Sequence, residues 1–362
     1  MSAQKKWNLQ TFSATTRIFG SNSTYTLTCA GQNNFVNLNQ ADIVLSLSVV
    51  GLPNNATYSI GRPSTTWINQ MNVQVEYITP EGPQIVNYNG YNNRGIAANV
   101  LETLEYSASK YSQYDPIEFL SPQAGLTTTD FEVLIPLKFL ADAAYDANLV
   151  NIDHITFNIT FISQAEIFTF TSGNPVVNCN HLDIKYPSWI VSSPEVIPAE
   201  LREIPNRQVY VQNADLILGA SAVNTQVAVP FPCSVLYYFF ISKDSNYNMN
   251  PNPLSVVTSH SLTSMGEVFP LISNYGANYT PGISQVGIIR HYMELMDISG
   301  KDKPENNSVL SFNEWFNNKR IYCIEVGVEQ QNGQNFNFSS TFAQQLAQAA
   351  TCVMVFLGRT HI

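Results

Sequence analysis

Histidine is the side chain best suited to proton transfer and metal binding near neutral pH. The chain has five, far apart in the sequence, at His154, His181, His260, His291 and His361. No Gly-rich phosphate loop, G-x-S-x-G turn or H-E-x-x-H helix occurs to bring a catalytic group to a substrate. We interpret His154 as a surface residue and His291 as a packed or interface residue. The sequence therefore predicts no catalytic residue, and we expect that the protein is not an enzyme.

One short acidic stretch, residues 297–302, has some of the character of a calcium-binding loop. It lacks the alternating acidic ligands and the closing glutamate that a calcium site needs, so we interpret it as a solvated loop. No set of nucleophile, base and oxyanion donor can be assembled elsewhere. We therefore predict no catalytic, cofactor-binding or metal-binding residues, and no cofactor.

The cysteines give no sign of a disulfide framework or a zinc site. They are odd in number, widely spaced and form no C-x-x-C motif, at Cys29, Cys179, Cys233, Cys323 and Cys352. We expect them to be small buried hydrophobic residues of a protein in a reducing compartment.

Composition limits what the chain can bind. Its 362 residues and 44% hydrophobic content suffice for about two domains, whereas only 12% of the residues are charged. The net charge of −10 argues against general nucleic-acid binding, because affinity for phosphates comes from clustered Lys and Arg. No apolar run approaches the ~18–20 residues that span a bilayer, and residues 1–10 predict no signal peptide. We expect a β-rich protein whose polar, mostly uncharged surface meets other proteins.

Apolar alternation is the main structural signal. Residues 131–137 and 155–161 place apolar side chains at every second position, which predicts strands with one buried face. Pro136 cannot donate to a sheet, so the first of these strands should end there or lie at an edge. Residues 235–241 are apolar without a break, which predicts burial on both faces. Other strands are predicted at residues 43–49, 68–77, 84–88, 209–218, 227–229, 254–262, 320–328 and 351–357.

Three segments have helical features. Residues 95–107 carry apolar side chains at helical spacing, and residues 138–147 are rich in alanine. Residues 286–298 are ambiguous, because Ile289, Tyr292, Met293 and Met296 fit a helix while the β-branched start fits a strand.

The chain is predicted to form two β-sandwiches. Five prolines between residues 173 and 206 argue against a continuous strand and predict an extended connector, so we place the boundary near Glu200. Residues 1–34, rich in Ser, Thr and Asn and with one possible short strand at residues 25–29, are interpreted as an N-terminal arm. Residues 35–200 then form the first sandwich with its connector, and residues 201–362 form the second.

Several of these segments together resemble double jelly-roll viral capsid proteins. Residues 68–75, the I-P-L-x-F stretch at 135–139 and the strand at 153–161 are similar, in this order, to the first jelly roll of that family. Residues 321–326, followed by a Gly-containing turn and the N-F-S sequence within 335–339, resemble the signature of its second jelly roll.

The resemblance implies an all-β fold of two tandem eight-stranded jelly-roll sandwiches, with short helices in the loops. It also implies a major capsid protein of a DNA virus, a structural virion protein whose homotrimers form pseudo-hexameric capsomers that tile an icosahedral shell. The implied partners are further copies of the chain, neighbouring capsomers, minor capsid or penton proteins, and an internal viral membrane reached by the N-terminal arm. We expect no sequence-specific nucleic-acid binding, and localisation in the virion after synthesis in the host cytoplasm or nucleus.

The aromatic run at residues 237–240 would place rings on both faces of its strand. A lone sandwich would leave one of these faces in water, which soluble monomers avoid. We expect the neighbouring jelly roll or a second subunit to cover it, and a local loop or helix is the alternative cover.

Two other functions fit a β-rich chain. The Tyr/Asn-rich stretch at residues 88–93 could stack on and hydrogen-bond to sugars, which suggests a carbohydrate-binding lectin or fibre-type attachment protein. The same residues also suit an ordinary turn. A β-rich hydrolase is the third reading, and no catalytic constellation supports it.

Overall fold

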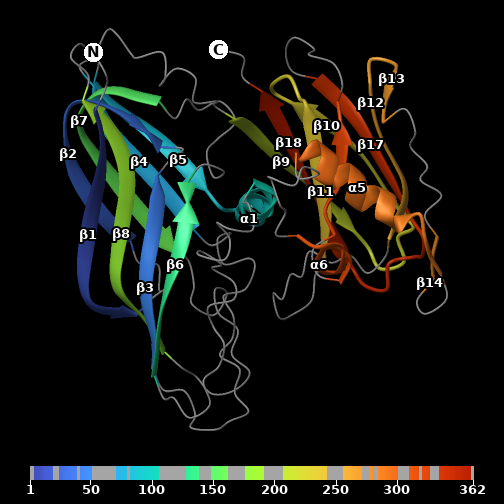
Figure 1. The fold of residues 1–362 in the computed structure, drawn as a ribbon, viewed down its shortest axis with the longest axis horizontal. Coiled ribbons are helices and arrows are strands. Elements are labelled where there is room, and N and C mark those ends of the chain that lie inside the picture. Colours follow the sequence, from blue (N-terminus) through green and yellow to red (C-terminus); the bar gives the residue numbers. More distant parts are fainter. Residues whose placement is uncertain are drawn as a thin grey trace. The chain divides into compact units, whose positions relative to one another are not determined.

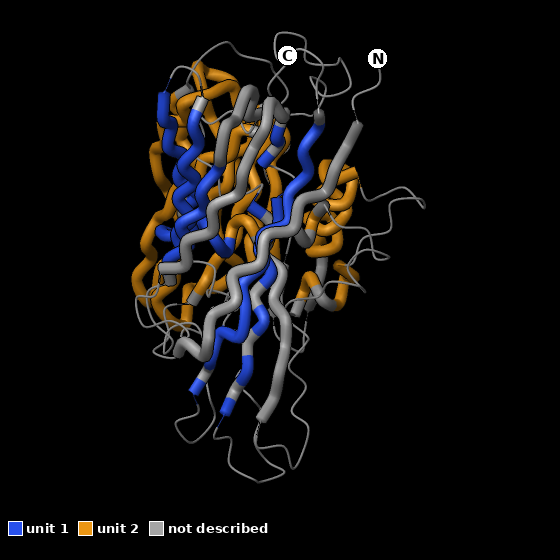
Figure 2. The backbone as a smooth tube through the Cα atoms, turned by 90° about the vertical axis from the view of Figure 1, so that its left-hand side faces the viewer, with its two compact units in different colours: residues 1–96, 114–206, 361–362 blue, residues 97–113, 207–360 orange. Residues whose placement is uncertain are grey.

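The computed structural model describes the parts of the chain that form its strands and helices. Two compact units are present, one made of residues 1–96, 114–206 and 361–362 and the other of residues 97–113 and 207–360 (Figure 2). Residues 97–113 thus group with the second unit although they fall in the first half of the sequence. The described residues are 4–18, 24–38, 41–50, 71–79, 82–105, 128–137, 148–161, 176–190, 207–242, 256–270, 278–280, 284–300, 310–317, 320–326 and 334–359.

The first unit is built on one eight-stranded antiparallel sheet (Figure 1). Helix α1 (Arg94–Glu105) begins shortly after its fifth strand. The strands are β1 (Gln4–Ile18), β2 (Thr24–Asn37), β3 (Asp42–Val50), β4 (Met71–Thr79), β5 (Gly82–Asn89), β6 (Thr128–Pro136), β7 (Asn148–Phe161) and β8 (Val176–Ile190).

The strand order of this sheet is that of a jelly roll. One row is β1-β8-β3-β6, the other is β2-β7-β4-β5, and the chain crosses between rows at every connection except the β4–β5 hairpin. This order is produced by two successive Greek keys. Residues 34–36 of β2 also pair with β8, so the two rows join into one sheet.

The second unit repeats the order strand for strand. Its rows are β9-β18-β11-β16 and β10-β17-β12-β13, which match the rows of the first unit position by position. The strands are β9 (Arg207–Leu216), β10 (Ala222–Val229), β11 (Val235–Ser242), β12 (Val257–Ser264), β13 (Glu267–Phe269), β16 (Tyr322–Glu325), β17 (Gln334–Phe342) and β18 (Ala350–Arg359). Between β13 and β16 lie a small hairpin and two helices, namely β14 (Asn278–Thr280), β15 (Ser284–Val286), α5 (Ile288–Ile298) and α6 (Phe312–Asn317). The predicted fold of two eight-stranded jelly rolls with short helices in the loops is therefore confirmed.

Apolar alternation decides the core of each unit. In β7, Ile155, Phe157 and Ile159 are buried while the residues between them are half-buried, as predicted. In β10, Val223, Val227 and Val229 face inward. Residues 350–358 of β18 are all buried, which agrees with a central strand covered on both faces.

The prediction of an N-terminal arm is wrong. Strand β1 pairs with β8 from Gln4 to Ile18, and β2 pairs with β7 and β8. A polar segment with few apolar residues still gains backbone hydrogen bonds when it lies beside a long strand. Composition does not reveal that neighbour, so only the short strand at residues 25–29, which lies within β2, could be predicted.

The predicted connector at residues 173–206 is also wrong in part, because β8 runs through Pro187. On one side Pro187 stands opposite Trp7 of β1. On the other side β8 pairs with β3 up to Lys185 and with β2 from Ser188, so Pro187 falls between two partner strands. A residue without an N–H is tolerated where the ladder is interrupted.

The ambiguous segment at residues 286–298 is mostly helix α5. Gly287 precedes it with a φ of +78°, a left-handed conformation that favours glycine. The helix turns a different face inward from the one suggested by Ile289 and Met293, which are exposed. Its buried residues are Ile288, His291, Leu295 and Met296.

The helix predicted at residues 138–147 lies outside the described residues. Helix α1 agrees with the prediction for residues 95–107. None of the helices that the structure describes is both long and apolar enough to cross a bilayer.

Replacing Gly358 by alanine should destabilise the second unit by about 1–3 kcal/mol through overpacking. A Cβ at this position would lie 2.6 Å from Cδ2 of Phe231 and 2.9 Å from the Pro232 carbonyl oxygen. Urea unfolding monitored by circular dichroism measures the change. In a Phe231→Leu background the same substitution should cost less, because the ring that it meets is gone. Equal stability of Gly358→Ala and the unmodified protein would contradict the expected clash.

Candidate functional site

The structure brings together two histidines that the sequence left apart. His260 and His291 are buried, with 2% and 1% of their surfaces exposed, whereas His181 is half-exposed. The side chains of His154 and His361 lie outside the described residues. The interpretation of His291 as a packed residue agrees with its burial, but its pairing with His260 was missed.

Strand β12 directs His260 inward through an irregularity. Residues of a regular strand alternate between faces, so Val257 and His260, three positions apart, would face opposite sides. The pairing of β12 with β17 shifts register between Val257 and Ser259, and both Val257 and His260 are buried. This bulge aims the imidazole at the interior.

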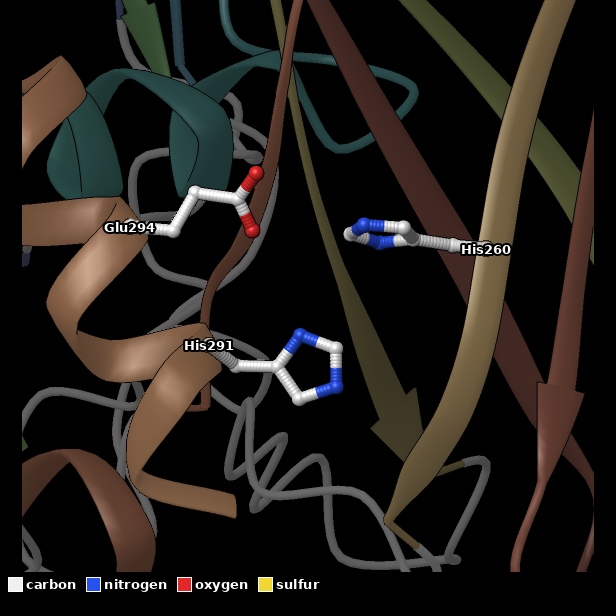
Figure 3. Close-up of side chains that lie close together, drawn as sticks. All are labelled: His260, His291 and Glu294. Carbon is white, nitrogen blue, oxygen red and sulfur yellow. The ribbon is translucent and has the colours of Figure 1, made fainter. Parts of the chain in front are cut away.

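Helix α5 supplies the other side of the cluster. His291 and Glu294 are three residues apart and so lie on one face of the helix. One ligand atom from each of His260, His291 and Glu294 lies within 4.8 Å of the others. Figure 3 shows the three side chains pointing into a common space between the helix and the strand.

Two hydrogen bonds hold the imidazoles. Nδ1 of His260 lies 2.7 Å from the Tyr238 hydroxyl oxygen, and Nε2 of His291 lies 3.0 Å from the carbonyl oxygen of Val257. The centroids of the two imidazole rings are 5.3 Å apart, and the rings meet edge to face. The ring of His291 also packs edge-on against Tyr322 at 5.1 Å.

Burial keeps both imidazoles neutral. It lowers the pKa of His291 to about 4, against which the hydrogen bond to Val257 acts only in part. It lowers the pKa of His260 well below the usual range, and the neighbouring His291 lowers it further. Because a neutral imidazole has one protonated and one unprotonated nitrogen, each ring can offer a lone pair. Two lone pairs and a carboxylate form a donor set suited to a metal ion.

The aromatic strand β11 is buried within the single chain. Residues 237–241 have at most 6% of their surfaces exposed. Tyr238 stacks on Tyr322 at 5.2 Å and meets Phe338 edge-on at 4.8 Å, which joins the two rows of strands. The part of the expectation in which a second subunit covers this strand is therefore wrong, because residues 237–241 are already buried within one chain.

The loop that suggested sugar binding offers little for stacking. Tyr88 and Gly90 are buried, and Tyr91 is half-buried. No aromatic side chain is fully exposed among the residues whose burial the structure describes. The acidic stretch at residues 297–302, interpreted above as a solvated loop, begins with Asp297, whose side chain is exposed. Residues 301–302 lie outside the described part of the chain.

The thiols agree with the prediction of buried small residues. Four are free and buried, namely Cys179, Cys233, Cys323 and Cys352. The side chain of Cys29 lies outside the described residues.

Comparisons of this chain with known proteins by sequence and by fold give different results. No family model and no curated protein matches this chain by sequence. A chain in the cryo-EM structure of the Sputnik virophage is similar in fold, with 12% identity, a TM-score of 0.55, and coverage of 98% of this chain and 85% of that one. The Faustovirus major capsid protein is similar with 10% identity, a TM-score of 0.51, and coverage of 99% and 90%. At such identities the likeness shows the fold, a double jelly roll that takes in nearly the whole chain.

Proposed function

We propose that this chain is a structural capsid subunit, found in the virion, whose trimers form pseudo-hexameric capsomers of an icosahedral shell. The observation that carries the proposal is the repeat of one jelly roll twice in a single chain. The likeness to the Faustovirus major capsid protein spans 99% of this chain, so both jelly rolls take part in it. We also propose that the protein has no enzymatic activity.

The repeat supports hexagonal packing on geometric grounds. Two units with the same strand order, placed around a threefold axis, give six similar edges. Three chains can then occupy a six-cornered position in a shell. The expected partners are further copies of the chain, neighbouring capsomers, and minor capsid or penton proteins.

Exposed apolar side chains at strand ends support contacts between subunits. Ile217 and Leu218, between β9 and β10, are 78% and 65% exposed, and Met265, between β12 and β13, is 82% exposed. Only 12% of the chain is charged, and the cores of protein interfaces are depleted in charge. Burial of these side chains against a neighbour would remove them from water.

No membrane contact through an N-terminal arm is proposed, because residues 4–18 and 24–37 are strands of the sheet. Carbohydrate binding is the alternative function, and no aromatic side chain is fully exposed among the residues whose burial the structure describes.

The proposal predicts a trimer in solution. Light scattering coupled to size-exclusion chromatography should give a mass near three times 40.3 kDa at micromolar concentration. Negative-stain images of the same sample should show particles with a hexagonal outline. A stable monomer would contradict the capsomer and favour the attachment-protein alternative, which a glycan-binding screen then tests.

A further inference from the structure

We infer that His260, His291 and Glu294 bind one divalent transition-metal ion, of which zinc fits best, and that this ion fastens α5 to β12 inside the second unit. The inference is independent of the proposed capsid function. It departs from the expectation, made from the sequence, that the protein binds no metal.

The spacing of the donors suits a small ion. The three ligand atoms lie within 4.8 Å of one another. Around a zinc ion with bonds of about 2.0–2.2 Å, neighbouring ligand atoms stand about 3.3 Å apart. Rotation of the Glu294 side chain toward the two rings, together with small ring adjustments, closes this difference. Three protein ligands leave a fourth tetrahedral position for water.

The hydrogen bond of His291 sets the tautomer that binding requires. A carbonyl oxygen only accepts, so Nε2 of His291 carries the proton and donates it to Val257 across 3.0 Å. The Nδ1 atom of the neutral ring then holds the lone pair. Metal-binding histidines almost always donate their other nitrogen in this way, often to a backbone carbonyl.

Tyr238 plays the matching part for His260. Its hydroxyl oxygen lies 2.7 Å from Nδ1, and a hydroxyl can accept a hydrogen bond as well as donate one. In the tautomer that metal binding requires, Nδ1 donates its proton to this oxygen and Nε2 is the binding atom. Tyr238 is fully buried and held between Tyr322 and Phe338, which restrains the imidazole that it contacts. Both histidines therefore have an outer partner that orients them.

The surroundings favour a cation of this class. Two imidazoles and one carboxylate match zinc and similar ions, whereas calcium and magnesium prefer sites built from oxygen. Glu294, which is half-buried, supplies the carboxylate of this donor set.

The location indicates a structural ion. Helix α5 belongs to the long insertion between β13 and β16, and it joins the sandwich here through side chains. An ion that bridges β12 and α5 closes this insertion onto the core. Hydrogen exchange of the α5 amides should therefore slow when zinc is added.

Metal titration of the full-length chain tests the inference. Protein stripped with EDTA and dialysed is titrated with zinc chloride by calorimetry, and the zinc retained after gel filtration is counted by mass spectrometry. We expect one zinc per chain and, with cobalt chloride, the visible absorption bands of a tetrahedral site. Failure to retain one zinc per chain would overturn the inference.

Three variants each remove one ligand of the ion. Each replacement keeps either the hydrogen-bond donor or the size of the original side chain. His260→Asn retains a donor to Tyr238, His291→Gln retains a donor to Val257, and Glu294→Gln keeps the size of the side chain. Loss of a residue that only hydrogen-bonds a metal ligand typically weakens metal binding about 10–100-fold. Each of these variants loses a ligand itself, so its affinity for zinc should fall at least that much. Circular dichroism verifies that each variant is folded.

His181→Asn is the matched control, because it removes a half-exposed histidine outside the cluster. It should leave the stoichiometry and affinity for zinc unchanged. If folded variants of the three ligands bind zinc as tightly as the unmodified protein, or if His181→Asn alone abolishes binding, the ion lies elsewhere and the inference is wrong.

Discussion

Tyr238→Asp should leave the second unit unfolded and the protein insoluble, without yielding a folded monomer. Tyr238 is fully buried between Tyr322 and Phe338 and hydrogen-bonded to His260. Loss of the aromatic side chain costs about 3–5 kcal/mol, and burying an unpaired carboxylate adds several more. Together these rival the whole stability of a domain, about 5–15 kcal/mol. Soluble yield, circular dichroism and sedimentation measure the outcome.

Two controls separate misfolding from failed assembly. Tyr238→Phe keeps the ring and loses only a buried hydrogen bond, so it should remain folded with a loss of about 1–2 kcal/mol. Asn224→Asp adds the same charge at an exposed position of β10 and should change little. A Tyr238→Asp protein with a native circular dichroism spectrum and the mass of a monomer would show instead that β11 faces a subunit contact.

Raising the pH from 8 to 10 should lower the unfolding free energy of the second unit by about 4–6 kcal/mol. Burial raises the pKa of Cys233 to about 12, and it also raises the pKa values of Cys323 and Cys352 above the usual range. In the unfolded chain these thiols ionise near pH 8.5, so the unfolded state releases protons first as the pH rises. Their contribution to stability is therefore complete below about pH 8 and is lost progressively above it.

Urea titrations at intervals from pH 7 to 10.5, with a reductant present, measure this dependence. Each thiol contributes about 1.4 kcal/mol per pH unit between its unfolded and folded pKa values. Cys352→Ala should therefore reduce the slope of the unfolding free energy against pH by about one third. Any change in stability at pH 7 comes from the altered packing and does not affect this slope. A slope that is the same with and without Cys352 would mean that this thiol ionises in the folded protein.

Local patterns predicted the elements well, because the alternation that makes a strand is visible in adjacent residues. Residues 155–161 form most of β7, and the unbroken run at 235–241 became β11, buried on both faces as expected. The helix at residues 95–107 was likewise recoverable from its spacing. Segments without such a signal were not predicted correctly. Residues 4–18, for example, were interpreted as part of an arm although they form β1.

The sequence by itself determined that the chain is all-β, that it contains two similar halves, and that the four cysteines whose side chains the structure describes belong in the core. Only the tertiary structure decided where Pro187 could be tolerated, because that depends on the point at which β8 changes partner strands. Only the tertiary structure brought His260 to His291, through a bulge in β12 and a helix that begins after Gly287. Side chains that meet across a sandwich are specified by contacts between distant segments, and no local period along the chain carries that information.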